Sequence, residues 1–261
     1  MPDSAPLPFH GPVYDMRALG FAAGEVVVIT GGGSGIGRAT ALAAARSGLA
    51  VAIWDVTGDA ADETARQARA LGVAALPLTL DVADGAAVIT AWEASRALGH
   101  CRYLVNNAGP ASGTSGEFAS LLAHAAGSME RVTTGWLERC GEDAASVVCL
   151  ASIAGNFQGG GTTLQPFYPA AKAAIAGYVR WLATRHGGRP RANAIAPGLA
   201  LTPRTIPLLE HPLVAETMTR IPMGRAAFAE EVASAILFLL SPAASYINGA
   251  LLPVDGGWSI A

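Results

Sequence analysis

The sequence predicts an α/β domain with a doubly wound parallel sheet and helices on both faces. Short β-branched runs alternate along the chain with stretches of helical pattern, and a glycine-rich turn follows the first run. This alternation, with room for a helix between successive strands, is typical of parallel crossovers. The chain has 261 residues, of which 51% are apolar and 14% are charged, so one large domain with a sizeable core is expected.

The expected elements follow one another without an internal repeat or a second domain. Residues 1–22 contain four prolines and little periodicity, and we interpret them as an N-terminal arm, able to lie on a neighbouring subunit, before a domain over 23–261. Strands are expected at 26–29, 50–54, 74–80, 102–106, 145–151, 190–196 and 250–254. Helices are expected at 35–47, 59–71 and 229–240 and in the remaining intervals. Ligands of such sheets bind outside the carboxyl ends of the strands, so the residues after each strand are the site candidates.

Composition and charge argue against several classes of function. The formal net charge is −3, whereas nucleic-acid binding calls for a basic face. The richest apolar run, 235–240, stops at Ser241-Pro242 and is far shorter than the roughly 20 residues of a membrane span. Three cysteines without metal-ligand spacing, and no export signal, indicate reduced thiols in the cytoplasm and no metal site.

The first strand runs into a glycine-rich turn, Thr30-Gly-Gly-Gly-Ser-Gly-Ile-Gly37, that opens the first helix. Glycine leaves room for a phosphate beside bare backbone, and the free N–H groups and dipole of a helix start attract an anion. In this strand-turn-helix context the turn predicts a dinucleotide-phosphate site. Its expected cofactor-binding residues are Gly31, Gly33, Ser34, Gly35, Ile36 and Gly37.

Asp55 at the end of the second strand indicates which dinucleotide is bound. A carboxylate there can accept hydrogen bonds from the adenosine ribose hydroxyls and would repel a 2′-phosphate, so NAD is expected rather than NADP. Neither Ser34 nor Val56 offers the positive charge that an NADP site needs. Arg38 could point toward such a phosphate, which keeps NADP open as an alternative.

The segments that follow the strands together resemble the short-chain dehydrogenase/reductase family over residues 24–258. The matching segments are Thr30 to Gly37, Asp81-Val82, Asn106-Asn107-Ala108-Gly109, Ser152, Tyr168-x-x-x-Lys172, Pro197-Gly198 and Val254-Asp255-Gly256-Gly257. The resemblance implies a Rossmann-type fold, hydride transfer between nicotinamide and an alcohol or carbonyl compound, and a homotetramer. It also implies further cofactor contacts at Asp81, Val82, Asn107, Ala108, Gly109, Tyr168, Lys172, Pro197, Gly198 and Thr202.

The catalytic residues can be argued from their chemistry as well. Tyr168 and Lys172 are four apart in a helical run and so share a face, as any exposed pair at this spacing would. The ordinary pKa of a phenol, near 10, is too high for an efficient base, and a nearby ammonium would lower it. We therefore expect Tyr168 to be the general acid/base. Ser152, at a strand end, can hydrogen-bond the reacting oxygen.

The sequence departs from the family pattern at His124 and in two loops. His124 stands where the family places an asparagine that serves a proton relay, and the segment between Gly109 and His124 is shorter than usual. An imidazole can relay protons itself, but an ordinary helix histidine is the favoured interpretation. The loop from Ser152 to Tyr168 is longer than usual, and its glycines 159–161 indicate a sharp bend or movement.

The segments expected to form the substrate pocket are rich in apolar residues, which favours a small hydrophobic alcohol or ketone. The apolar candidates are Phe157, Leu164, Phe167, Leu199, Leu201, Ile206, Leu208, Leu209, Met218 and Met223. Arg204 and His211 are the polar exceptions, interpreted as solvated. Two alternatives stay open: an NADP-dependent reductase of acyl-thioester or pteridine-like substrates, and a catalytically weak protein that senses NAD(H).

Overall fold

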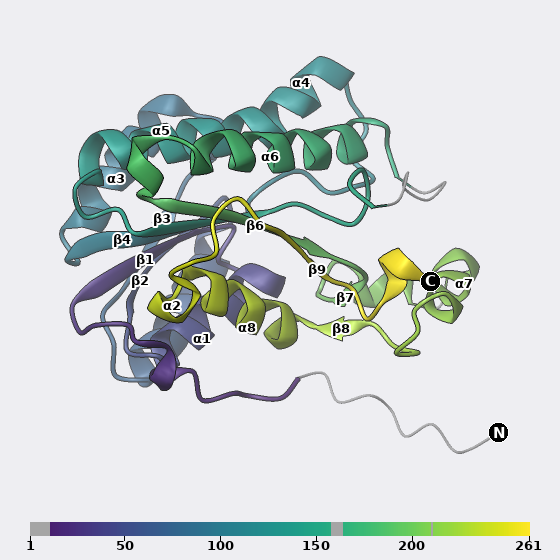
Figure 1. Ribbon diagram of the computed structural model, residues 1–261, viewed down its shortest axis with the longest axis horizontal. Helices are drawn as coiled ribbons and strands as arrows, with labels where there is room; N and C mark the ends of the chain where they lie inside the picture. Colours follow the sequence, from purple (N-terminus) through teal and green to yellow (C-terminus); the bar gives the residue numbers. More distant parts are fainter. Residues whose placement is uncertain (1–10, 158–163, 210) are drawn as a thin grey trace.

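The computed structural model describes residues 11–157, 164–209 and 211–261, and a parallel sheet runs through their centre (Figure 1). Its seven strands lie in the order β3-β2-β1-β4-β5-β6-β9. The strands are β1 (Glu25–Thr30), β2 (Ala50–Asp55), β3 (Ala75–Thr79), β4 (His100–Asn106), β5 (Ser146–Leu150), β6 (Arg191–Pro197) and β9 (Leu251–Val254). Each lies within two residues of a predicted strand, and the predicted doubly wound fold is confirmed.

The strand order reverses between β1 and β4, and this reversal positions the site. From β1 the chain continues to β2 and β3 on one side of the sheet, and from β4 it continues to β5, β6 and β9 on the other side. Crossover helices therefore diverge at this point and leave a crevice outside the carboxyl ends of the two strands. Residues 26–29 of β1 are completely buried, as expected of a β-branched strand covered on both faces.

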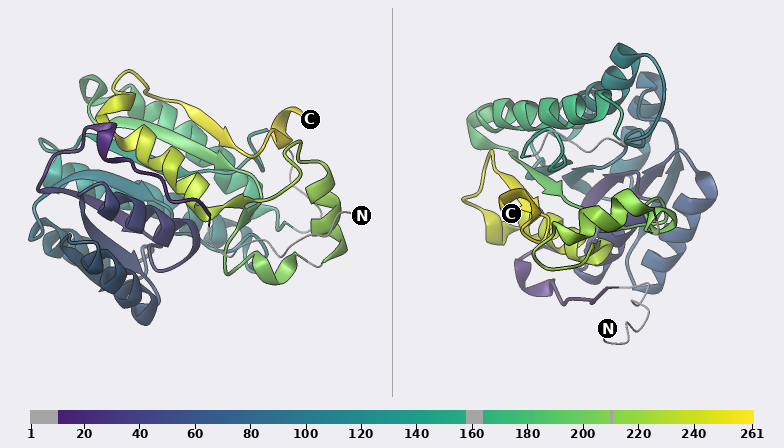
Figure 2. Two further views of the ribbon diagram at one scale, coloured as in Figure 1. Left: turned by 90° about the horizontal axis from the view of Figure 1, so that it is seen from below. Right: turned by 90° about the vertical axis from the view of Figure 1, so that its right-hand side faces the viewer.

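Helices cover both faces of the sheet (Figures 1 and 2). One layer contains α1 (Gly35–Arg46), α2 (Gly58–Ala70) and α8 (Ala229–Leu240), and the other contains α3 (Gly85–Arg96), α5 (Ser128–Cys140) and α6 (Phe167–Ala183). The second layer packs on three completely buried tryptophans, Trp54, Trp92 and Trp136. Their indole N–H groups donate to Ser95 Oγ and to the carbonyl oxygens of Val132 and Cys101, so no indole donor is left unpaired.

Short elements surround the crevice at the carboxyl edge of the sheet. They are α4 (Phe118–Leu122), a π-helical turn (Ala123–Gly127), β7 (Ala200–Leu201), α7 (Pro212–Thr219) and β8 (Ala227–Phe228). The two-residue strands β7 and β8 pair in parallel and were not predicted, because so short a strand carries no readable alternation. Remaining 3-10 turns span Arg17–Leu19, His186–Gly188, Ile206–Leu208, Pro242–Ala244 and Trp258–Ile260.

The second half of the predicted N-terminal arm packs against the domain itself. Met16, Leu19 and Phe21 contact the core on the α8 side of the sheet, and the Phe21 ring meets Tyr103 edge-on at 5.2 Å. Residues 1–10, and the glycine run predicted to bend or move, lie outside the described residues. No helix in the described ranges is long and apolar enough to cross a membrane. Those ranges also contain no group of acidic, cysteine and histidine side chains placed to hold a metal ion.

Arg191, the first residue of β6, connects the sheet to the end of α8. Its guanidinium donates four hydrogen bonds, to the carbonyl oxygens of Leu239, Leu240, Ser241 and Ile247. The last carbonyl groups of a helix have no partner within it. Arg191 therefore supplies charged donors to the end of α8, where the Ser146 hydroxyl also donates to the Leu239 carbonyl oxygen.

Replacing Arg191 with methionine should lower the free energy of unfolding by roughly 2–4 kcal/mol, because buried carbonyl groups lose charged donors. Chemical denaturation followed by circular dichroism measures this. Arg66→Met is the matched control, since Arg66 forms an exposed ion pair with Glu63 and should cost less than about 1 kcal/mol. Equal losses in the two variants would contradict the assigned role of Arg191.

Candidate active site

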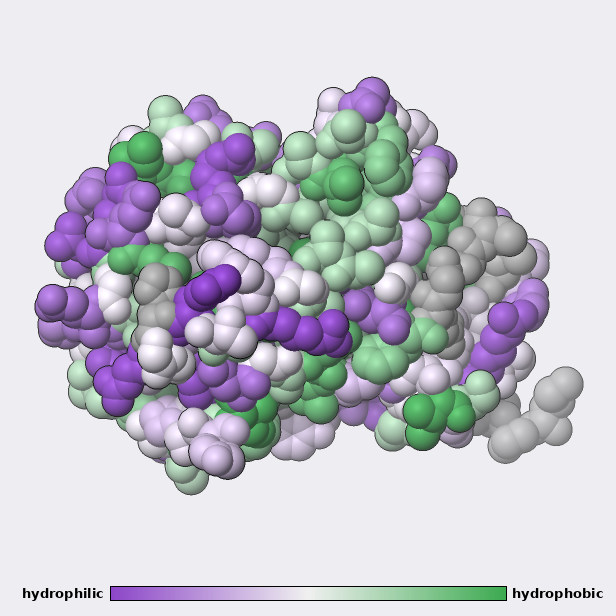
Figure 3. Space-filling view, turned by 45° about the horizontal axis from the view of Figure 1, so that its top comes forward, coloured by the Kyte–Doolittle hydropathy of each residue, from purple (hydrophilic) through white to green (hydrophobic). Residues whose placement is uncertain are grey.

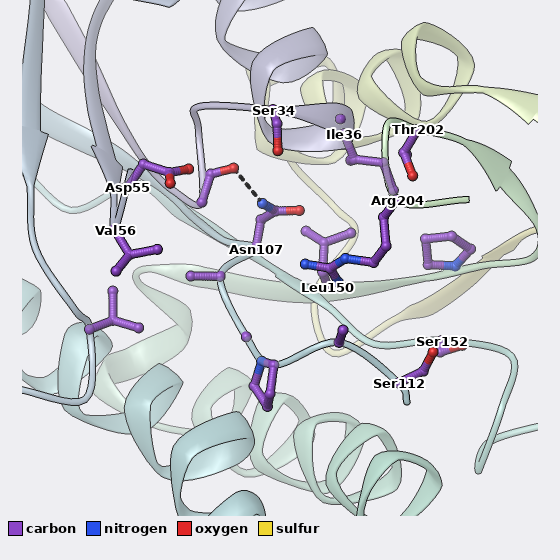
Figure 4. Close-up of a pocket in the computed structure, with 18 of the residues that line it drawn as sticks. Ser34, Ile36, Asp55, Val56, Asn107, Ser112, Leu150, Ser152, Thr202 and Arg204 are labelled. Carbon is purple, nitrogen blue, oxygen red and sulfur yellow. Dashed lines mark hydrogen bonds between the residues drawn. The ribbon is translucent and has the colours of Figure 1, made fainter. Parts of the chain in front are cut away.

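A cavity of about 580 Å³ opens at the carboxyl ends of the strands, at the predicted place (Figure 4). It is lined from the ends of β1 to β6 and from the segment after β7. The predicted site residues that line it are Gly31, Ser34, Gly35, Ile36, Asp55, Asp81, Val82, Asn107, Ala108, Gly109, Ser152, Tyr168, Lys172, Pro197, Gly198 and Thr202. The fold thus brings together residues that are up to 171 positions apart, from Gly31 to Thr202.

Gly33 and Gly37 are not among the residues that line the cavity, and a cofactor contact of either stays a prediction. A side chain on Gly37 would put its Cβ 2.0 Å from the carbonyl oxygen of Gly31, so this glycine permits α1 to approach the turn. A Cβ on Gly33 would lie 2.7 Å from an Asp55 carboxylate oxygen. Both glycines allow the turn to pack closely behind the cavity wall. The first residues of α1 face the cavity.

Asn107 and Thr30 join the ends of β4 and β1 beneath the cavity. The Asn107 amide donates to the carbonyl oxygens of Thr30 and Gly31, each at 3.0 Å. Thr30 Oγ1 accepts the backbone N–H groups of Asn107 and Ala108, also at 3.0 Å. Sequence reasoning missed Thr30, because its partners are about 77 residues away and no local pattern indicates them.

Asp55 ends β2 with both carboxylate oxygens engaged by backbone donors. Oδ2 accepts the Gly33 N–H at 2.8 Å and Oδ1 accepts the Thr57 N–H at 2.9 Å, which fixes the carboxylate at the cavity wall. Arg38, the residue that kept NADP open, is turned to α2. Its Nε donates to Thr64 Oγ1 at 3.0 Å, and it does not line the cavity.

Ser152, Tyr168 and Lys172 meet at the opposite end of the cavity from Asp55. The Lys172 ammonium donates to the carbonyl oxygen of Leu150 at 2.6 Å and lies 5.6 Å from the centre of the Tyr168 ring. Burial lowers the pKa of Lys172 to about 8, because the ammonium is removed from water. The chain contains no other lysine, so this group has no counterpart elsewhere in the protein.

The pKa of Tyr168 differs from the expectation. Burial raises it above its ordinary value, and a hydrogen bond with Ser152 and the positive charge of Arg204 offset this in part. The predicted lowering by Lys172 is not found, which corrects the argument from helical spacing. Spacing places two side chains on one face, but it does not reveal how much water the fold removes from them.

Asn156 holds the serine and lysine segments together and was not predicted. Its side-chain amide donates to the carbonyl oxygen of Ser152 at 2.9 Å and to that of Lys172 at 3.0 Å. The loop after β5 is thereby tied to α6. The sequence signal was weak, since an asparagine in a loop is usually a turn residue.

His124 lies in the π-helical turn and lines the cavity beside Asp81. Its Nε2 is 3.5 Å from an Asp81 carboxylate oxygen. Within the described residues no hydrogen bond joins His124 to Lys172, whose ammonium is directed to Leu150. This placement favours the interpretation of His124 as an ordinary helix histidine, and a relay through it stays an untested alternative.

The expected apolar lining is not borne out by the described residues. The segment after β6 contributes polar and small groups to the cavity: Ala200, Thr202, Pro203, Arg204 and Thr205. Phe167 is instead buried against α4 and the π-helical turn, and Leu208 and Met223 are exposed. The direction of loop side chains follows no period, so the sequence could not show which of them face the cavity.

Comparison with known proteins identifies the family. A family model described as enoyl-(acyl carrier protein) reductase matches residues 31–259, nearly the whole described domain. The chain belongs to the short-chain dehydrogenase/reductase family. This confirms the resemblance stated from the motifs.

Individual members of the family resemble the chain over most of their length. Cis-4-hydroxycyclohexanecarboxylate dehydrogenase of Sinomonas cyclohexanicum is 38% identical over 90% of this chain and 96% of its own. Galactitol 2-dehydrogenase (L-tagatose-forming) of Cereibacter sphaeroides is 34% identical over 94% and 99%. A structure of a putative 2-deoxy-D-gluconate 3-dehydrogenase from Agrobacterium tumefaciens with bound NADP superposes with a TM-score of 0.79, at 31% identity, over 92% and 98%.

The chain is therefore a short-chain dehydrogenase/reductase, an oxidoreductase that acts on alcohols and ketones. The family uses NAD or NADP. The cavity fits such a dinucleotide on three grounds: its size, the glycine turn and helix start at its wall, and the fixed carboxylate of Asp55 at its far end. Ser34, Gly35 and Ile36 would hold the diphosphate at the start of α1, and Thr202 would hold the carboxamide.

The single lysine makes the lowered pKa of Lys172 directly measurable. Selective ¹³C labelling of lysine gives one Cε resonance, which should titrate near pH 8 in the folded protein. In denaturant the midpoint should return to about 10.4. Between these values the unfolded chain binds more protons, so this group raises the free energy of unfolding as pH increases. A folded-state midpoint above about 10 would contradict the burial of this ammonium.

Proposed function

We propose that the protein is an NAD-dependent dehydrogenase/reductase of small secondary alcohols and ketones, with Tyr168 as general acid/base. The observation that supports this best is one continuous cavity. It carries Ser152, Tyr168 and Lys172 at one end and the fixed carboxylate of Asp55 at the other. Both reactants can therefore lie in one site, with the reacting oxygen near Tyr168.

Each catalytic side chain has a distinct task in this proposal. Tyr168 gives a proton to the carbonyl oxygen in reduction and takes one from the alcohol in oxidation. Ser152 donates a hydrogen bond to the same oxygen and stabilises the charge that develops there. Lys172 brings a positive charge beside the phenol and would also hold the nicotinamide ribose. A bound nicotinamide supplies the hydride donor or acceptor.

NAD is proposed over NADP because of Asp55 and Arg38. The Asp55 carboxylate stands where an adenosine ribose would lie, and it would repel a 2′-phosphate. Arg38, the cation next to the glycine turn in sequence, donates to Thr64 and does not line the cavity. NADP stays the alternative, since a related structure contains it.

We further propose that the enzyme works in the cytoplasm as a homotetramer. Figure 3 shows apolar residues gathered on part of the face that carries α4, α5 and α6. Phe118 and Trp181 on this face are 46% and 51% exposed. Large exposed aromatic side chains of this kind suit burial between subunits.

Replacing Tyr168 with phenylalanine should reduce kcat for a secondary alcohol with NAD on the order of 10²- to 10⁴-fold, because only the proton-transferring hydroxyl is lost. Steady-state absorbance of NADH measures the rate, and NADH fluorescence should show that the variant still binds the cofactor. Tyr178→Phe is the control, since Tyr178 lies on the same helix and does not line the cavity. Turnover that survives in Tyr168→Phe would refute the assigned role. No turnover by the native protein, with tight NADH binding, would support the cofactor-sensing alternative.

Asp55→Asn should weaken the discrimination between cofactors. In the native protein NADPH should bind at least ~100-fold more weakly than NADH, because carboxylate and phosphate repel each other. The amide removes this charge and leaves a hydrogen-bond acceptor, so the ratio should fall about tenfold or more. Fluorescence titration measures both affinities. Asp59→Asn, on exposed α2 surface, is the control. A native preference for NADPH would reject the proposed cofactor.

A further inference from the structure

Arg204 is exposed to solvent, as the sequence suggested, and stands on the segment after β7. It lines the cavity together with Thr202, Pro203 and Thr205. Figure 4 shows its side chain extending inward from the strand segment that also carries Thr202. Across the described residues, neither a hydrogen bond nor an ion pair of its guanidinium is found. The five donors of this group are therefore available to a ligand.

The backbone that carries Arg204 is fixed by a tight turn. The Thr205 N–H donates to the Thr202 carbonyl oxygen at 3.0 Å, and the Thr202 N–H donates to Thr205 Oγ1 at 2.9 Å. Thr205 Oγ1 also donates to the carbonyl oxygen of Ala200, in β7. The base of the arginine side chain is thus set before any ligand arrives, which reduces the entropy lost on binding.

Charge is distributed unevenly along the cavity. Asp55 and Asp81 lie at the end predicted for adenosine, whereas Lys172 and Arg204 lie with Tyr168 at the other. Among the described lining residues, no carboxylate stands at the catalytic end. Lys172 donates one hydrogen bond to the Leu150 carbonyl, whereas none of the five donors of Arg204 has a partner among the described residues. Its charge is felt by both Tyr168 and Lys172, which places it close to the reacting groups.

We propose that Arg204 binds a carboxylate on the substrate, so that the enzyme acts on a hydroxy acid or oxo acid rather than on a neutral apolar alcohol. The inference rests on the proposed function and narrows its substrate class. A guanidinium presents parallel donors that match the two oxygens of a carboxylate, and such charge-assisted pairs are the strong ones.

The cofactor diphosphate is the other anion that could occupy this guanidinium. It has donors of its own, because Ser34, Gly35 and Ile36 bring the start of α1 to the cavity wall. The positive charge of Arg204 instead affects Tyr168 and Lys172, at the end of the cavity where the substrate must lie. The substrate carboxylate is therefore the better match, and the experiment separates the two.

The test uses oxo acids of increasing spacing, each paired with its neutral amide: 3-oxobutanoate, 4-oxopentanoate and 5-oxohexanoate. Calorimetry measures their binding to protein saturated with NAD⁺. An oxidised cofactor cannot reduce a ketone, so binding is measured without turnover. At the best spacing the acid should bind ~10- to 100-fold more tightly than its amide. In Arg204→Gln this ratio should fall to about one, with NAD⁺ affinity unchanged.

Arg220→Gln is the matched control, since Arg220 follows α7, pairs with Glu216 at the surface and does not line the cavity. It should keep the native ratio of acid to amide. The inference is overturned if the native protein binds acids and amides alike at every spacing, or if Arg204→Gln weakens both equally. A loss of NAD⁺ affinity in Arg204→Gln would assign the guanidinium to the diphosphate. Turnover of neutral ketones with NADH is measured in parallel, so that the proposed dehydrogenase activity stands or fails separately.

Discussion

The connection between Thr30 and Asn107 is the constraint on which the site depends. Thr30 ends β1 and Asn107 directly follows β4, and the sheet order reverses between these two strands. Four hydrogen bonds of 3.0 Å join the strand ends, from the Asn107 amide to two carbonyl groups and from two backbone N–H groups to Thr30 Oγ1. The glycine turn follows β1, and the segment that forms the cavity floor follows β4. The relative position of these two strands therefore sets the width of the crevice.

Three ionisable groups lie at the catalytic end of the cavity. Lys172 and Tyr168 are buried, whereas Arg204 is exposed. Burial disfavours both the Lys172 ammonium and the Tyr168 phenolate, so each is shifted toward its neutral form. The positive charge of Arg204 acts on both groups. A positive charge near the phenol favours its ionised form, so a group that binds Arg204 also alters the acidity of Tyr168. Substrate recognition and proton transfer are therefore coupled electrostatically.

The fold and the location of the site could be predicted because their signals are local. Buried β-branched runs, a glycine turn after a strand, and Tyr168 with Lys172 at helical spacing can all be read from a few adjacent residues. The misses need contacts between distant segments. The role of Thr30 depends on residues about 77 positions away, and Asn156 bridges two separate segments. Arg204 was placed in the pocket segment, but loop side chains follow no period that would show which of them face the cavity. The raised pKa of Tyr168 depends on burial, which spacing does not encode.

The turn from Thr202 to Thr205 places two kinds of recognition on one rigid unit. Thr202 is the residue proposed to hold the cofactor, and Arg204 is the one proposed to bind the substrate. The hydrogen bonds that hold the turn join Thr202, Thr205 and Ala200 and do not use the Arg204 side chain. Arg204 can therefore be replaced without disturbing the backbone of the turn. In evolutionary terms this separates selectivity from reactivity. Gene duplicates could acquire new metabolic niches by mutation at a single codon while inheriting an intact catalytic apparatus.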